Sequence, residues 1–166
     1  MMEHEAFIRQ CIALSEQAVR HGNEPFGALL VVDGDVRLTA QNQVLIESDP
    51  TRHAELLLAS EAARRLDAAA LERATLYTST EPCVMCCGAI YWSRIPRVVF
   101  GCSAVELGVV ADGSLVMPSR QVFASGTRRV EGVGPCARDR GAGGAPGLLE
   151  RAVISWNGTD VWFGGP

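Results

Sequence analysis

Apolar residues recur with two different spacings along the first two thirds of the chain. Between residues 5 and 20 they return every three or four positions, which predicts an amphipathic helix ending near a left-handed cap at Gly22. Residues 28–32 form a continuous apolar run, and Asp33-Gly34 supplies a tight turn before a returning strand at 36–42. Because the first strand is apolar on both faces, helices are expected on both sides of the sheet.

The middle of the chain predicts alternating helices and strands. A turn at 48–51, where Asp49 or Thr51 provides a cap and Pro50 sets the entry, leads into an Ala-, Leu- and Glu-rich helix at 53–66. The pattern then predicts a short connection at 68–72, a strand at 74–79, a helix at 83–93 with Pro82 at a first helical position, and a strand at 97–101. The two longer helices therefore begin at junctions of the kind where open α/β sheets bind ligands.

The last third is less regular. Residues 111–114 predict a loop and 128–133 a last strand, whereas 148–156 fit either a helix or a strand. Residues 141–147 are Gly-rich and predict a flexible link. We expect one domain over residues 1–166, with a Gly-rich tail from about 141.

Composition fits a folded domain. The 166 residues are 48% hydrophobic and 20% charged, a balance that can fill a core. No apolar run approaches the roughly 18–20 residues of a membrane span, and the acidic start lacks a basic secretory signal. A cytoplasmic location without membrane association is therefore expected, and in that compartment the six cysteines are expected to be thiols.

Charge restricts the chemistry further. The net charge of −4 disfavours a long polyanion as partner, so nucleic acid would need a local basic patch. All basic residues apart from histidine are arginines, which excludes Schiff-base and lysine-nucleophile chemistry.

Four residues in two short stretches predict a metal centre. His53, Cys83 and Cys86 supply an imidazole and two thiolates, and three such ligands leave one position of a tetrahedral Zn²⁺ for a catalytic water. Glu55 follows His53 closely and is the candidate proton shuttle. Two other interpretations stay open: a structural zinc closed by a fourth protein ligand, and a redox-active C-x-x-C pair.

The two stretches, His-x-Glu and Pro-Cys-x-x-Cys, match the signature of zinc deaminases that act on nucleobases. The region from about 25 to 114 resembles the cytidine deaminase-like superfamily, in the branch with guanine deaminases, fungal cytosine deaminase and tRNA adenosine deaminases. The resemblance is carried by Pro-Phe-Gly-Ala (25–28), Asn42, His-Ala-Glu (53–55), Leu-Tyr-Thr-Ser-Thr-Glu-Pro-Cys-Val-Met-Cys (76–86) and Gly-Ala-Ile-Tyr-Trp-Ser-Arg (88–94). It implies a three-layer α/β/α fold with a five-stranded mixed sheet, a bound Zn²⁺ and a homodimer.

The resemblance also implies roles for substrate-binding residues. Asn42 and the backbone amide of Ala54 would hold the polar edge of a base, and Phe26 would stack near its ring. As alternatives, Phe26 is plain core packing and Asn42 only a turn residue. Trp92 would wall the pocket or belong to a dimer surface, and packing or an interface is favoured slightly.

The substrate is less closely specified. We expect the protein to deaminate a small free base or nucleoside and to release ammonia. Guanine, a close analogue of guanine, or cytosine is the preferred substrate. The alternative is a tRNA-specific adenosine deaminase. Asp112 lies near the position of an acidic residue that assists substrate binding in guanine deaminases, although Asp112-Gly113 also reads as a turn. In the tail, Trp162 or Phe163 is either a lid over the pocket or part of a disordered end.

Overall fold

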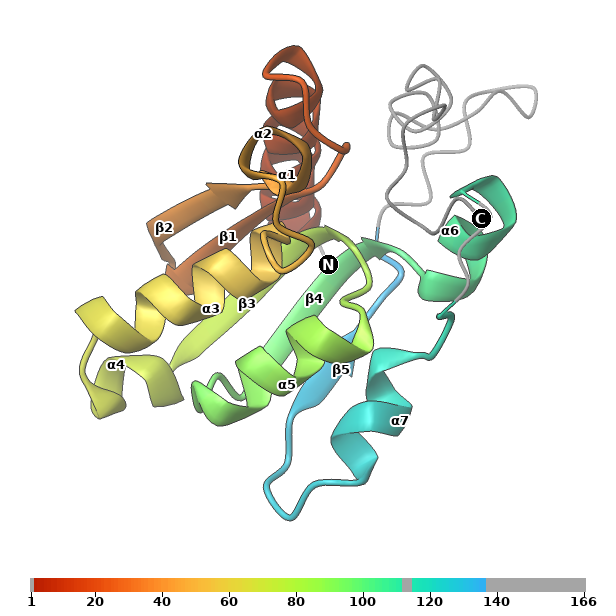
Figure 1. Ribbon diagram of the computed structural model, residues 1–166. Helices are drawn as coiled ribbons and strands as arrows, with labels where there is room; N and C mark the ends of the chain where they lie inside the picture. The colour runs from red at the N-terminus through yellow and green to blue at the C-terminus, as the bar shows by residue number, and fades with distance from the viewer. Residues whose placement is uncertain (1, 112–114, 137–166) are drawn as a thin grey trace.

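The computed structural model describes residues 2–111 and 115–136 (Figure 1). The strands are β1 (Gly27–Val32), β2 (Asp35–Gln41), β3 (Ala74–Thr80), β4 (Arg97–Cys102) and β5 (Glu131–Val133). The helices are α1 (Met2–Arg20), α2 (Val44–Glu47), α3 (Ala54–Arg65), α4 (Ala68–Glu72), α5 (Val84–Trp92), α6 (Ala104–Ala111) and α7 (Ser119–Ala124).

One mixed sheet organises these elements. Its strand order is β2-β1-β3-β4-β5, with β1 antiparallel to both neighbours and β3, β4 and β5 mutually parallel. The predicted hairpin is confirmed, and Asp33 and Gly34 both have positive φ at its turn. The five-stranded α/β architecture expected from the resemblance is also confirmed.

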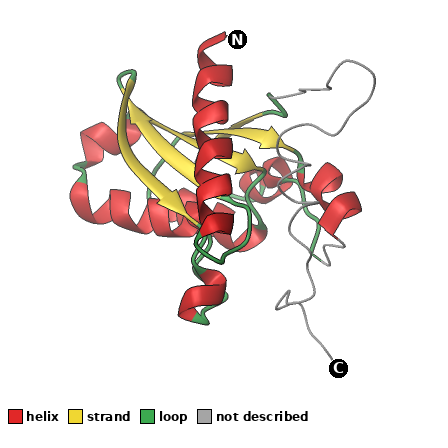
Figure 2. Cartoon of the chain, turned by 90° about the horizontal axis from the view of Figure 1, so that it is seen from above, coloured by secondary structure: helices red, strands yellow, loops and turns green. Residues whose placement is uncertain are grey.

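Helices cover both faces of the sheet, as the two-sided apolar pattern of the first strand predicted. Leu29 and Val31 point toward α1 and join a core with Ile8. Leu30 and Val32 point the other way and join a larger core with Leu58 of α3. Figure 1 shows α3, α4 and α5 on one side of the sheet, and Figure 2 shows α1, which begins at the labelled N-terminus, lying across the other side. The alternation along β1 therefore fixes the three layers.

The approach of α1 to β1 depends on Gly27. A Cβ atom there would lie 2.6 Å from the Cys11 carbonyl oxygen and 2.7 Å from the Ser15 amide nitrogen. These are backbone atoms of α1, so the helix would have to move. We expect Gly27→Ala to lower the free energy of unfolding by about 2 kcal/mol, measured by urea denaturation.

Gly88→Ala is the matched control, because a Cβ atom at Gly88 would meet nothing within 4 Å. Since Gly88 lies inside α5, alanine there should be neutral or stabilise by up to about 1 kcal/mol. Equal stability of the Gly27→Ala variant and the unchanged protein would contradict the close packing of α1 on β1.

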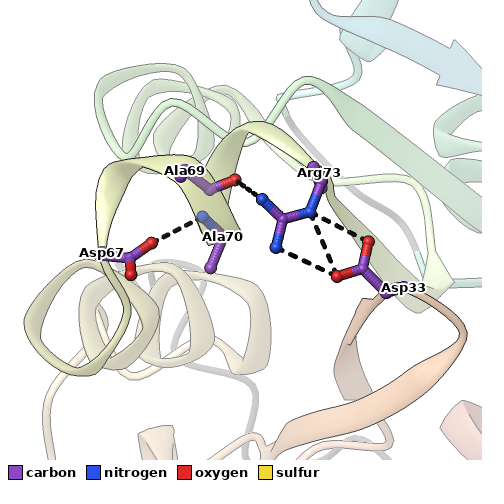
Figure 3. Close-up of polar contacts among 5 residues, drawn as sticks. All are labelled: Asp33, Asp67, Ala69, Ala70 and Arg73. Atoms are coloured by element: carbon purple, nitrogen blue, oxygen red, sulfur yellow. Dashed lines mark hydrogen bonds and ion pairs between the residues drawn. The ribbon is translucent and has the colours of Figure 1, made fainter.

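The predicted connection at 68–72 is a helix instead. Asp67 caps α4 by accepting a hydrogen bond from the Ala70 amide at 2.8 Å, and Arg73 at its end donates to Asp33 in the hairpin turn (Figure 3). The guanidinium of Arg73 also donates to the Ala69 carbonyl at 2.7 Å. A helix of five residues is too short to be stable by itself. The Asp67 cap and the ion pair between Arg73 and Asp33 therefore stabilise α4.

Several boundaries also differ from the predictions. His53 and Cys83 are the N-cap residues of α3 and α5, so the prediction of Pro82 at a first helical position is wrong. Likewise, Asp49 and Thr51 do not cap α3; the Asp49 carboxylate instead accepts from the Thr51 amide at 2.8 Å. The short helix α2, and also α6 and α7, were not predicted.

Other predictions fall outside the described residues. These are Asp112, most of the 111–114 loop, the Gly-rich link at 141–147, the segment at 148–156, and Trp162 and Phe163. Within residues 2–111 and 115–136, none of the helices has the length and apolar character needed to cross a membrane.

Candidate active site

Three residues from two helix starts meet beside the sheet. His53 caps α3, Cys83 caps α5, and Cys86 lies in the first turn of α5. Their ligand atoms all lie within 4.8 Å of one another, and the Cys83 Sγ atom is 3.7 Å from Nδ1 of His53. The structure thus brings together the three residues that the sequence predicted as metal ligands.

The end of β3 sets the position of Cys83. After Thr80, the Glu81 amide donates to the Cys102 carbonyl at 2.7 Å, which continues the pairing with β4 by one residue. Pro82 and Cys83 then turn the chain into α5, where the Cys87 amide donates to the Cys83 carbonyl at 2.9 Å. Cys83 and Cys86 therefore lie about one helical turn apart at the N-terminal end of α5.

The donor set fits Zn²⁺. With Zn–S bonds near 2.3 Å and Zn–N bonds near 2.0 Å, ligand atoms around a tetrahedral ion are about 3.5–3.8 Å apart. The distance between Cys83 Sγ and His53 Nδ1 already lies in this range. Among the described residues, no fourth His, Cys, Asp or Glu joins the group, which fits an open catalytic site better than a closed structural one.

Mutual interaction of the thiols favours a thiolate at Cys83. A hydrogen bond from the Cys86 thiol lowers the pKa of Cys83 to about 4, and His53 contributes in the same direction. That hydrogen bond, together with burial, raises the pKa of Cys86. Burial alone would lower the pKa of His53, but the Cys83 hydrogen bond and neighbouring negative charges raise it. The arrangement therefore favours a thiolate at Cys83, and metal binding would release the protons that remain on the ligands.

Glu55 lies directly beside these ligands. Its side chain is only 4% exposed, its Oε1 atom accepts from the Thr78 hydroxyl at 2.7 Å, and its Oε2 atom is 3.7 Å from Cys86 Sγ. Burial raises the pKa of Glu55 above its ordinary value. A carboxyl group with a raised pKa can exchange protons near neutral pH, as a general acid and base must.

A second buried carboxyl group supports Asn42. Glu24 accepts a hydrogen bond from the Asn42 Nδ2 atom at 3.0 Å, while the Asn42 Oδ1 atom accepts from the Val44 amide at 3.0 Å. Burial raises the pKa of Glu24, and the positive charge of His53 opposes that effect. Asn42 is thus both a turn residue and part of a buried polar network next to His53, so its substrate role stays a prediction.

The other predicted substrate-binding residues lie in different places. Ala54 is the first residue of α3, so its amide has no acceptor within the helix. Phe26 is half-buried, and its carbonyl accepts from the Asn42 amide at 3.0 Å. Trp92 ends α5, at the opposite end from the cysteine ligands, and is 82% exposed. Asp112 lies outside the described residues.

Sequence reasoning missed Glu81, which anchors the segment after β4. Its Oε1 atom accepts from the Ser119 amide at 2.7 Å and from the Ser119 hydroxyl at 2.6 Å, and its Oε2 atom accepts from the Ala104 amide at 2.9 Å. Ala104 begins α6 and Ser119 begins α7. One buried carboxylate therefore ties two helix starts to the loop that carries Cys83. The sequence signal that could have identified Glu81 is its position directly before Pro82 and Cys83.

Removing the Glu81 carboxylate should destabilise the fold. We expect Glu81→Ala to lower the free energy of unfolding by about 3 kcal/mol, because it leaves buried donors of Ala104 and Ser119 without their acceptor. Chemical denaturation measures the effect. Glu131→Ala is the control, since its exposed pair with Arg97 should contribute less than about 1 kcal/mol. Similar losses in both variants would contradict the anchoring role of Glu81.

Comparison with known proteins gives a consistent result. Residues 1–102 match the family described as "Cytidine and deoxycytidylate deaminase zinc-binding region". The chain is 45% identical over 100 residues to the guanine deaminase of Bacillus subtilis, covering 60% of this chain and 64% of that protein. It is 40% identical over 141 residues to the "Probable cytosine deaminase" of Schizosaccharomyces pombe, covering 81% and 85%.

A tRNA-specific adenosine deaminase of Bacillus subtilis is nearly as similar, with 40% identity over 101 residues that cover 61% of this chain and 63% of that protein. The match thus spans less than two thirds of the guanine deaminase and of the tRNA deaminase. Among solved structures, the Bacillus subtilis guanine deaminase superposes with a TM-score of 0.60 at 38% identity, covering 65% of this chain and 69% of that chain. A mutant of NE0047 in complex with 8-azaguanine superposes with a TM-score of 0.75 at 25% identity, covering 92% and 85%.

These relatives are named for different substrates, but all of them are named as deaminases. The family match includes His53, Glu55, Cys83 and Cys86, the four residues that the fold brings together. The chain therefore belongs to the cytidine and deoxycytidylate deaminase family.

Proposed function

We propose that this protein is a zinc-dependent hydrolytic deaminase of a free nucleobase or nucleoside, with guanine, a close analogue or cytosine as substrate. The observation that carries the proposal is the buried Glu55 carboxyl group, which lies 3.7 Å from Cys86 within the cluster of His53, Cys83 and Cys86. A proton carrier beside three potential zinc donors is what hydrolytic deamination requires. The similarity to guanine and cytosine deaminases supports the substrate class.

The roles of the protein groups follow from this geometry. Bound zinc would lower the pKa of a coordinated water from about 15.7 toward 7. Glu55 would accept one proton from the attacking water and give it to the ring nitrogen. It would then accept the second proton from the new hydroxyl group and give it to the amino group, which leaves as ammonia as the carbonyl forms. Thr78 holds Oε1 of Glu55, so Oε2 on the Cys86 side is the oxygen available for transfer.

Recognition of the base would use groups around Glu55. The Ala54 amide and one hydrogen of the Asn42 amide group would bind its polar edge, and Glu24 fixes the orientation of Asn42. Phe26 would pack near the ring. We also propose that Asp112 assists substrate binding.

A homodimer belongs to the same proposal. It rests on the family resemblance carried by residues 25–114. Trp92 is not assigned to the wall of the deaminase pocket, because it lies at the far end of α5 from Cys83 and Cys86.

The test is direct. The full chain, loaded with one zinc per subunit, is supplied with guanine, cytosine, isoguanine, adenine and the corresponding nucleosides, and ammonia release is followed. Release from guanine or cytosine is the expected result. No release from any compound would refute the proposal.

The second candidate is deamination of adenosine in tRNA, favoured by the similarity to a tRNA-specific adenosine deaminase. It requires a basic patch, for which the candidates are Arg64, Arg65, Arg94 and Arg97. Arg64 and Arg65 both contact Glu61 and Arg97 contacts Glu131, so ion pairing reduces the charge of all but Arg94. Filter binding of tRNA across a series of salt concentrations separates the two candidates, because phosphate-dependent binding is strongest at low salt. Absence of binding at low salt would exclude tRNA as substrate.

A further inference from the structure

A pocket lies at the C-terminal end of α5. Its volume is about 510 Å³, and its lining includes Glu72, Tyr91, Trp92, Arg94, Arg128 and Arg129. Cys83 and Cys86 lie at the other end of the same helix, roughly 10 Å away along its axis. The pocket is therefore separate from the candidate active site.

Arginines without carboxylate partners converge on this pocket. Most arginines in the described part of the chain bind a carboxylate or a carbonyl group: Arg9, Arg52, Arg64, Arg65, Arg73, Arg97 and Arg120. No carboxylate of the described residues pairs with Arg94, Arg128 or Arg129, and Glu72 alone contributes negative charge to the lining. A protein with a net charge of −4 thus concentrates positive charge at one place.

Tyr91 holds two of these arginines in position. The Arg128 guanidinium lies 4.6 Å from the centroid of the Tyr91 ring, and the Arg128 amide donates to the Tyr91 hydroxyl at 3.2 Å. The Arg94 amide donates to the Tyr91 carbonyl at 3.2 Å, and Arg94 has a left-handed φ of 64°. A non-glycine residue in this region is strained, and such strain is found preferentially at binding sites.

The lining contains both an unused donor and an exposed ring. The Nη2 atom of Arg128 is buried and has no hydrogen-bond partner among the described residues. An unpaired buried guanidinium donor is costly unless an acceptor reaches it. The Trp92 and Tyr91 rings are perpendicular at a centroid distance of 5.4 Å, and Trp92 is 82% exposed, so most of its indole surface is accessible to a ligand.

We propose that this pocket is a phosphate-binding site, in which Arg94, Arg128 and Arg129 hold the phosphate of a nucleotide and Trp92 stacks on its base. Guanidinium groups bind phosphate oxygens through paired hydrogen bonds, and an indole ring accepts any base. The phosphate can come from a free mononucleotide or from an RNA strand. The site goes beyond the proposed deamination and requires no zinc.

Binding to the full chain tests the site. Calorimetric titrations use adenosine 5′-monophosphate, inorganic phosphate, a ten-nucleotide single-stranded RNA, and adenosine as the probe without phosphate. Arg94→Gly keeps the left-handed turn, and Arg129→Ala removes an exposed side chain. Each substitution should weaken binding of the phosphate-bearing probes about tenfold, the loss expected for one charge-assisted hydrogen bond.

Arg37→Ala is the matched control, because Arg37 is an exposed arginine of β2 outside the pocket lining. Tighter binding of adenosine 5′-monophosphate than of adenosine, lost in the two pocket variants but not in Arg37→Ala, supports a mononucleotide site. If only the RNA binds, and its binding is weakened in the two pocket variants but not in Arg37→Ala, the result supports the site and assigns its phosphate to RNA. No phosphate-dependent binding, or equal losses in Arg37→Ala, would overturn the proposal. Ammonia release is not measured in these titrations, so a failed deaminase assay would not affect the outcome.

Discussion

Glu55→Gln is expected to reduce deamination about 10³-fold while leaving one zinc per subunit in place. Glutamine has nearly the same shape, and its carbonyl oxygen can still accept from Thr78. It cannot carry a proton from water to a ring nitrogen and an amine. Glu55 is also outside the group of three ligands, so metal content should not change. Steady-state ammonia release and metal analysis of the same preparation measure the two effects.

Glu61→Gln provides the matched control. Glu61 lies on the same helix but pairs with Arg64 and Arg65 at the surface. Its replacement should leave turnover within about twofold, because exposed ion pairs contribute little to stability. Full activity of Glu55→Gln would contradict the assignment of Glu55 as the proton carrier.

Cys86→Ser should remove both zinc and activity. A serine hydroxyl stays protonated near neutral pH and is a poor zinc ligand, whereas the thiolate of Cys86 would complete the donor set with His53 and Cys83. After dialysis, we expect less than about a tenth of a zinc per subunit, because losing a ligand should cost more than the roughly tenfold to hundredfold in affinity that losing a ligand's hydrogen-bond partner costs. Elemental analysis by mass spectrometry gives the stoichiometry.

The neighbouring Cys87 offers an unusually close comparison. It is also fully buried on α5, but its thiol donates to the Pro82 carbonyl at 3.4 Å rather than facing His53. A serine hydroxyl can make the same hydrogen bond, so Cys87→Ser should retain stoichiometric zinc. If Cys86→Ser kept its zinc, or if both variants lost it equally, the metal assignment would be wrong.

The strongly periodic elements could be predicted from the sequence because their patterns depend on local spacing. The apolar run in β1 and the Ala- and Leu-rich α3 are such cases, and both were placed within one residue at most boundaries. His53 and Cys83 were assigned to helices although they are caps. Their extended ψ values of 144° and 171° cannot be read from residue type, because neither side chain caps its own helix.

The short helices were missed for a different reason. The segment of α6 contains three valines and a glycine, residues with low helix propensity. Its start is stabilised by a capping box, in which Glu106 accepts from the Ser103 amide and the Ser103 hydroxyl accepts from the Glu106 amide. This Ser-x-x-Glu pattern was a usable signal. The bonds of Glu81 to Ser119 span 38 positions and could not be found by local reading.

The grouping of the three candidate metal ligands, His53, Cys83 and Cys86, was predictable from the sequence motifs, but the groups around them were not. Thr78 and Glu24 approach Glu55 and Asn42 only after the strands have paired. Neither residue carries a sequence pattern that distinguishes it from an ordinary strand threonine or loop glutamate. Buried polar networks of this kind become visible only in three dimensions.

The split of the ligands between the starts of α3 and α5 has a thermodynamic consequence. In the unfolded chain, His53 and Cys83 are separated by 30 positions, whereas the native fold holds them 3.7 Å apart. Zinc would bind the native state far more tightly than the unfolded chain. By mass action, the zinc concentration would therefore control the melting temperature of the protein. At a hundredfold excess over the dissociation constant the gain in stability would be about 2.7 kcal/mol, so the supply of zinc would help to determine how long each copy of the protein survives.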